Sequence, residues 1–159
     1  MRRFVTLLFS SLLGLSSAFS WAQSVTTYSP SQIMQMAEPL HAEAKSSNGT
    51  ATKILEQFPE YYTMLVYREK TGEVEVHQKF VDVMMIVDGS ATLVTGGSGE
   101  NMKVTKPGEQ RGSDIVGGSS VSLAKGVVAR VPAGVPHQVL LQPGEKITYF
   151  VVKVGTNTS

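Results

Sequence analysis

The sequence predicts an all-β fold, an antiparallel sandwich or barrel preceded by a short helical segment. From residue 61 onward, short runs rich in branched and aromatic residues alternate with turns that contain glycine or proline. The runs are regularly spaced, with no internal repeat and no linker between domains. A chain of 159 residues also has the length of one domain.

The expected strands are 62–68, 74–79, 83–87, 91–95, 102–105, 120–123, 127–131, 138–141 and 147–154. Asp88-Gly89 predicts a tight hairpin between the third and fourth of them. Residues 96–119 are the longest irregular stretch and are expected to form a loop over one end of the barrel. The apolar run 83–87 predicts a strand buried on both faces, so the N-terminal helix or a second subunit must cover its outer side. We therefore expect a homodimer.

A helix is expected to begin near Ser29, which can cap it, with Pro30 in the first turn and Gln32 completing a capping box. Apolar residues then recur at helical spacing: Ile33, Met36 and Leu40. Pro39 predicts a kink or a short helix.

The N-terminus has the pattern of a secretory signal peptide over residues 1–22. Arg2 and Arg3 precede an apolar stretch, and Ser20 and Ala22 provide small residues at a cleavage site. The alternative is an uncleaved membrane anchor, but the apolar run is shorter than the roughly 20 residues that a spanning helix needs. The expected organisation is thus a signal peptide (1–22), an N-terminal helical extension (23–60) and a β-barrel domain (61–155). The protein would be secreted or periplasmic, without a membrane anchor after cleavage.

Composition excludes several classes of function. The 14 lysines and arginines nearly balance the 13 acidic residues, which argues against a nucleic-acid partner. The sequence has no cysteine, so disulfides, thiolate metal sites and thiol nucleophiles are excluded. Any imidazole site must use His41, His77 or His137, and His41 lies among polar residues, as a surface or half-buried histidine does.

Two segments carry residues with metal-ligand chemistry. Glu75 and His77 are two apart on an expected strand, so they share a face. Asp82 begins the next strand, and His137 follows a loop that contains two prolines and a glycine. If these faces form the barrel interior, two imidazoles and one or two carboxylates converge there. Two histidines and a carboxylate form the ligand set of non-haem Fe(II) sites and also suit Mn(II), Zn(II) or Ni(II).

In these segments the sequence resembles the cupin superfamily, in particular small single-domain cupins of the conserved-barrel type 2. The segment from Gly126 to His137 matches the second cupin motif in the spacing of its glycines, proline and histidine. Asp82, followed by Gly89, matches the end of the first motif. The resemblance covers residues 62–152. It implies a double-stranded β-helix (a jelly-roll barrel), a metal at the matching positions and a substrate inside the barrel.

The first motif is degenerate. Where the family usually has His-x-His, this chain has Glu75-x-His77, and the family's glutamate is Asp82. The resemblance then implies a metal held by Glu75, His77, Asp82 and His137. This carboxylate-rich set favours Fe(II) or Mn(II) over Zn(II) or Ni(II). The alternative is a barrel without metal, in which Asp82 bonds the backbone at the rim and Glu75 is solvated.

Candidate substrate-binding residues are Met84, Arg111 and Tyr149. Met84 and Tyr149 could line a cavity or belong to the ordinary core. Arg111 could bind a substrate carboxylate or be a solvated loop charge. Glu75 could act as a catalytic base instead of a metal ligand.

Two functions from different classes follow. The first is a metal-dependent enzyme acting on a small molecule, as a dioxygenase, isomerase or lyase. The second is a non-catalytic module that binds a sugar or a small acid. The motifs predict a site without specifying a reaction.

Overall fold

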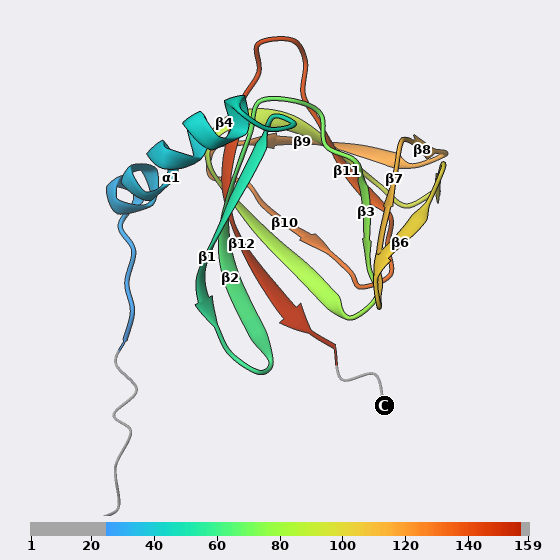
Figure 1. Cartoon of the computed structure of the whole chain (residues 1–159), viewed down its shortest axis with the longest axis horizontal. Helices are drawn as coiled ribbons and strands as arrows, with labels where there is room; N and C mark the ends of the chain where they lie inside the picture. The colour runs from blue at the N-terminus through green and yellow to red at the C-terminus, as the bar shows by residue number, and fades with distance from the viewer. Residues whose placement is uncertain (1–24, 157–159) are drawn as a thin grey trace, which may run out of the picture.

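The structure, a computed structural model, describes residues 25–156. Antiparallel strands curl into a barrel, and helix α1 (Pro30–Lys45) packs on its outside (Figure 1). This is the all-β architecture with a short N-terminal helix that the sequence predicts. The expected signal peptide, residues 1–22, lies outside the described residues.

Two curved sheets share one long strand, β4 (Phe80–Thr95). In the first sheet the order is β1 (Thr50–Gln57), β2 (Tyr61–Arg68), β12 (Ile147–Gly155), the first half of β4, and β10 (Val128–Val131). In the second the order is β9 (Ser119–Ala124), the second half of β4, β11 (His137–Leu140), β3 (Val74–His77), β7 (Glu109–Gly112) and β6 (Lys103–Lys106). A separate pair joins β5 (Ser98–Gly99) and β8 (Ile115–Val116).

The hairpin predicted at Asp88-Gly89 is wrong, because β4 runs through this position. Its first half pairs with β10 and β12, and its second half with β9 and β11. Gly89 has φ +80°, and a Cβ there would collide with the carbonyl oxygen of Lys146 on the neighbouring segment. The glycine therefore lets β4 pass closely beside the start of β12 on its way from one sheet to the other.

The long loop expected over residues 96–119 is also wrong, because this segment contains β5, β6, β7 and β8. Strand β7 pairs with β3 in a register that sets Glu109 opposite His77 and Arg111 opposite Glu75. Two polar residues expected in a loop thus lie in the wall of the barrel.

The helix start is confirmed. The Ser29 side chain accepts a hydrogen bond from the Gln32 backbone N–H, and the Gln32 side chain accepts one from the Ser29 N–H. Pro39 lies within one helix of 16 residues and does not shorten it. The buried face of α1 packs against β1, β2 and the end of the apolar run in β4, with this set of residues: Ile33, Ala37, Leu40, Ala44, Ala51, Leu65, Tyr67 and Val87.

The helix covers only part of the outer side of that run, since Met85 remains 41% exposed. Strand β1 falls within the range 23–60, which was expected to be a helical extension, and it adds a strand to the first sheet. None of the helices in the described part of the chain has the length and apolarity needed to cross a membrane.

The barrel interior follows the two-residue period of its strands. Along β4 and β12, alternate side chains enter the core, and their neighbours face outward. The buried apolar residues inside the barrel are Val66, Met84, Ile86, Ala91, Leu93, Leu123, Val131, Val139, Leu141, Ile147, Tyr149 and Val151. At one end of this apolar core, the same inward-facing positions carry polar residues.

Candidate metal centre

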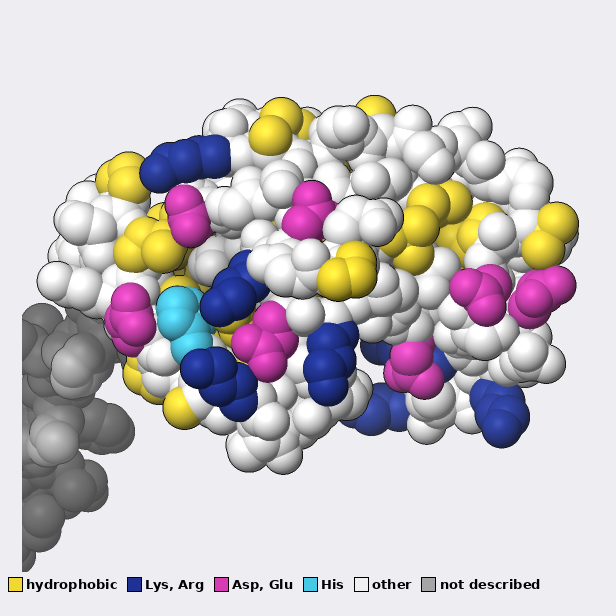
Figure 2. Space-filling view, turned by 90° about the horizontal axis from the view of Figure 1, so that it is seen from above, with side chains coloured by type: hydrophobic (Ala, Val, Ile, Leu, Met, Phe, Trp, Pro, Cys, Tyr) yellow, Lys and Arg dark blue, Asp and Glu magenta, His cyan; other side chains and the backbone are white. Residues whose placement is uncertain are grey.

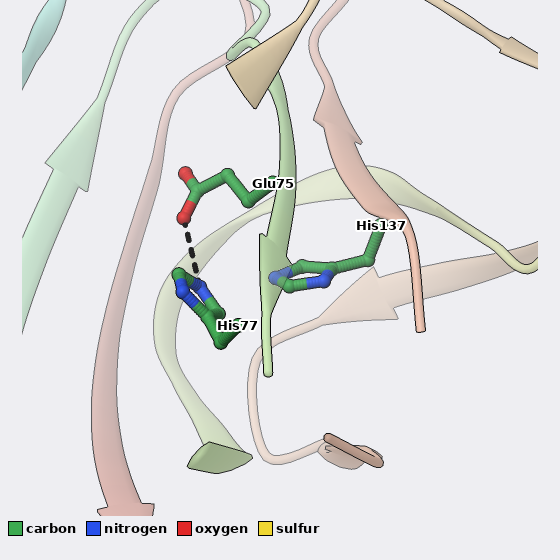
Figure 3. A group of neighbouring side chains, drawn as sticks. All are labelled: Glu75, His77 and His137. Atoms are coloured by element: carbon green, nitrogen blue, oxygen red, sulfur yellow. Dashed lines mark ion pairs between the residues drawn. The ribbon is translucent and has the colours of Figure 1, made fainter. Parts of the chain in front are cut away.

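Three of these polar residues come from two neighbouring strands. Glu75 and His77 share the inner face of β3, and His137 is the first residue of β11, directly opposite Glu75 in the strand register. Figure 3 shows the three side chains pointing toward one another. The predicted shared face of Glu75 and His77 is therefore confirmed, and residues far apart in the sequence meet there.

The loop before β11 sets the position of His137. Gly134 has φ +76°, and its N–H donates a hydrogen bond of 2.9 Å to the carbonyl oxygen of His77. Glycine adopts this left-handed conformation without the steric cost that other residues meet. The loop is thereby attached to the end of β3, and the two imidazole centroids lie 5.2 Å apart.

Both imidazoles present the same nitrogen to the centre. Nδ1 of His77 lies 2.6 Å from a carboxylate oxygen of Glu109, and Nδ1 of His137 lies 3.1 Å from the carbonyl oxygen of Val135. Both partners can only accept, so each Nδ1 carries the proton and each Nε2 presents its lone pair to the centre. The lone pair of His77 faces the Lys153 ammonium at 2.7 Å. This anchoring through the second ring nitrogen is what orients histidine for metal binding.

The donor atoms of Glu75, His77 and His137 all lie within 4.8 Å of one another. A Glu75 carboxylate oxygen is 3.2 Å from Nε2 of His77. Both histidines are 5% exposed, so water screens this cluster of electron-pair donors only weakly. Two imidazoles and a carboxylate are ligands for a divalent cation, and the residues fit such an ion.

Asp82, the fourth predicted ligand, adjoins this group from β4. One of its oxygens is 3.7 Å from Nε2 of both His77 and His137. The same oxygen lies 2.5 Å from the Lys153 ammonium, and the other oxygen is buried with no hydrogen-bond partner among the described residues. Asp82 is thus buried in an ion pair, unlike the rim residue of the metal-free alternative.

Glu75 is ionised and held in place by Arg68, the last residue of β2. An Arg68 N–H donates to one Glu75 oxygen at 2.7 Å, and another donates to the Tyr149 hydroxyl at 3.0 Å. Burial alone would raise the pKa of the Glu75 carboxyl, but its contact with the His77 imidazole and the charges of Arg68 and Arg111 hold that pKa well below its usual range. The alternative of a solvated Glu75 is not observed.

Other groups in the centre are held neutral. Burial lowers the pKa of His137, and the attraction of the nearby Glu75 carboxylate only partly opposes this. Burial, together with the charges of Asp82, Glu109 and Glu75, raises the pKa of Tyr62 to about 12. At neutral pH, His137 can therefore donate its lone pair to a cation, and Tyr62 keeps its phenolic proton.

The centre opens into a cavity of about 900 Å³. All three predicted substrate-binding residues, Met84, Arg111 and Tyr149, line it. Met84 and Tyr149 also belong to the buried core, so both sequence interpretations hold for them. Arg111 is 28% exposed and pairs with Glu75 and Glu109, which differs from a solvated loop charge.

Sequence reasoning missed three functional residues: Arg68, Glu109 and Lys153. Lys153 and Arg68 each interrupt or end an apolar strand with a single charge, and this signal could have found them. Glu109 carries no local signal, because its role depends on the pairing of β7 with β3.

No protein-family profile and no curated protein matches the sequence significantly. Among solved structures, the protein TT1209 from Thermus thermophilus is 19% identical, with a TM-score of 0.50 over 68% of this chain and 85% of that one. A cupin 2 conserved barrel domain protein from Rhodopseudomonas palustris is 14% identical, with a TM-score of 0.49 over 69% of this chain and 63% of that one. A cupin-2 domain from Rhodospirillum rubrum is 10% identical, with a TM-score of 0.49 over 70% and 63%.

The barrel is thus an all-β antiparallel fold with a short helix, and this fold is similar to that of TT1209. At such identities the likeness shows the fold, and any activity must be argued from the site itself.

Proposed function

We propose that the chain is a metal cupin that binds a small polar molecule in its barrel cavity. One observation carries this proposal: two histidines, each anchored through Nδ1, turn their Nε2 atoms toward the ionised carboxylate of Glu75. A buried set of electron-pair donors without protons is unfavourable unless a cation shares it. The predicted ligand set of Glu75, His77, Asp82 and His137 is retained in this proposal.

The carboxylates favour Fe(II) or Mn(II), with Zn(II) and Ni(II) as the alternatives. A bound divalent ion would supply Lewis-acid polarisation of a substrate oxygen. Arg111 and Tyr62 would orient the substrate from the cavity wall, where both lie. Glu75 is better suited to be a ligand than a base, because Arg68 already holds one of its oxygens.

Reaction classes that fit such a site are those of a dioxygenase, isomerase or lyase acting on a small molecule. The second candidate is a binding module for a sugar or small acid without turnover. The Lys153–Asp82 ion pair favours it, because it supplies a positive charge to the centre from the protein itself. A panel of sugars and small acids, screened by thermal stability and then by product formation, separates the two. Stabilisation without product supports the module.

Metal content tests the proposal directly. Protein purified without chelator is expected to contain close to one equivalent of metal, and His137→Gln should lose most of it. The matched control is His41→Gln, since His41 lies on α1 and packs against Tyr67, outside the cavity. Equal metal in the wild type and His137→Gln would contradict the assigned centre.

We also propose that residues 1–22 direct export. The basic start, the apolar stretch and the small residues before Gln23 support this. Exported protein should begin at Gln23 when its N-terminus is sequenced, and an intact Met1 would contradict the proposal.

A further inference from the structure

Lys153 is a buried cation inside the barrel, 6% exposed. It lies on β12 directly opposite Asp82 of β4, on the inward face that also carries Tyr149 and Val151. The strand register and the alternation of side chains therefore place the Lys153 ammonium in the centre, away from solvent.

The ammonium makes two contacts there. Its Nζ is 2.5 Å from the Asp82 oxygen and 2.7 Å from Nε2 of His77. Because Nδ1 of His77 donates to Glu109, Nε2 is the acceptor, and Lys153 donates to its lone pair. An imidazole Nε2 has one lone pair, and a metal ligand needs the same one.

The charges are a second reason why Lys153 and a metal ion cannot both contact His77. Glu75 and Asp82 are the carboxylates nearest the two Nε2 atoms, and Lys153 neutralises Asp82. A divalent ion bound by His77 would lie beside this ammonium in a poorly screened interior, where like charges repel strongly. Metal binding must therefore move Lys153 off His77.

We infer that the Lys153 ammonium and a divalent metal ion are alternative occupants of one cation position, so that Lys153 limits how tightly the centre binds metal. This inference rests on the proposed metal centre and adds its regulation. In the metal-free protein, Lys153 stabilises the buried Asp82 carboxylate. On metal binding, it gives up the lone pair of His77.

The test compares metal affinity with and without the ammonium. Chelator-stripped wild type, Lys153→Met and Lys153→Gln are titrated with Mn(II) and with Zn(II) in a calorimeter. Met removes the charge at similar length, and Gln keeps a neutral N–H donor for Asp82, so the second variant serves if the first does not fold. The matched control is Lys79→Met, which removes an exposed lysine at the cavity wall whose side chain makes no hydrogen bond to His77.

Both Lys153 variants are expected to bind metal at least about tenfold more tightly than the wild type, because a competing charge is gone. Lys79→Met should stay close to the wild type, since solvent screens its charge. Without metal, Lys153→Met should melt at a lower temperature than the wild type, because Asp82 is left buried and unpaired. Metal should restore much of this difference.

Equal or weaker binding by the Lys153 variants would overturn the inference and leave the metal centre in place. Tight binding by the variants and none by the wild type would support the inference, while showing that lysine is the resident cation of the natural protein. If no form binds metal, both the inference and the proposed function are wrong.

Discussion

Glu75 is held by two arginines that differ in burial and distance. Arg68 is 11% exposed in its side chain and 2.7 Å from one Glu75 oxygen, whereas Arg111 is 28% exposed and 3.7 Å from the other. A buried charge that loses its partner costs far more than an exposed pair that breaks. The two arginines should therefore contribute unequally to stability.

We expect Arg68→Met to lower the free energy of unfolding by about 3 kcal/mol, because it leaves a buried carboxylate without its nearest cation. Arg111→Met should cost less than about 1 kcal/mol. Chemical denaturation of the two metal-free variants measures both. Similar losses for the two variants would show that Arg68 has no special role at Glu75.

The pKa shifts of His137 and Glu75 predict how stability depends on pH. Folding depresses the pKa of His137 below its ordinary 6.5, so the unfolded chain binds a proton that the folded one resists. Folding also depresses the pKa of Glu75 below 4.5. Both groups contribute stability at neutral pH, and both contributions are lost as pH falls.

The free energy of unfolding of the metal-free protein should thus decline as pH drops below 6.5, and decline further below 4.5. Denaturation curves at several pH values measure this. His137→Gln should lose the first decline and keep the second. If the variant follows the wild type through both, His137 does not titrate as described.

For single residues, the sequence predicts those relations that follow from the spacing of residues along the chain. Glu75 and His77 share a face because strand alternation requires it, and the motif spacing indicated His137. The partners of Arg68 and Lys153 could not be predicted, because each side chain meets them through a strand register that distant pairing sets. A lone charge in an apolar strand marks burial without naming its partner.

Among the structural elements, the loop from Pro132 to Pro136 does most to position the centre. Its Gly134 needs a left-handed backbone and attaches the loop to His77. Gly144, in the turn before β12, has a similar φ of +86°, and no atom lies within 4 Å of the position that a Cβ would take there. Both glycines need a left-handed backbone, but only Gly134 belongs to the loop that positions the metal centre.

Gly134→Ala and Gly144→Ala should each destabilise the protein by about 1–2 kcal/mol, the cost of a left-handed alanine. Only Gly134→Ala should also weaken metal binding, because it moves the loop that holds His137. Thermal melts and metal titrations on both variants separate the two effects. Equal metal affinity in both would show that the loop does not position the ligand.

Most strands were predictable, since their composition and turn signals are local. Both exceptions depend on contacts with distant segments. A glycine next to an aspartate usually marks a hairpin, but Gly89 instead allows β4 to pass close to another segment of the chain. Residues 96–119 look irregular because their strands are short and polar, and only pairing with β3 makes β7 a strand.

At the scale of the whole molecule, the barrel combines an apolar core with one polar end that opens to the cavity. Figure 2 shows acidic and basic side chains interspersed on the face seen from above, with no extended field of one sign. This mixture of charges matches the nearly equal numbers of basic and acidic residues in the sequence. The homodimer expected from the apolar run in β4 stays a prediction, with Met85 exposed on its outer side.

The fold class was predictable because many weak signals agree: strand spacing, turn residues and the two motifs. The charge arrangement inside the barrel was not, because it depends on which strands meet across the interior. The arrangement of charged side chains at the polar end is therefore seen only in the structure. We propose that a divalent cation binds there.

An anomalous-scattering map from crystals of the protein grown with Mn(II) tests that claim most directly. We expect one strong peak within bonding distance of Glu75, His77 and His137, with the Lys153 ammonium moved away from His77. A map in which Mn(II) binds elsewhere, or in which Lys153 still donates to His77 with the three side chains unliganded, would contradict it.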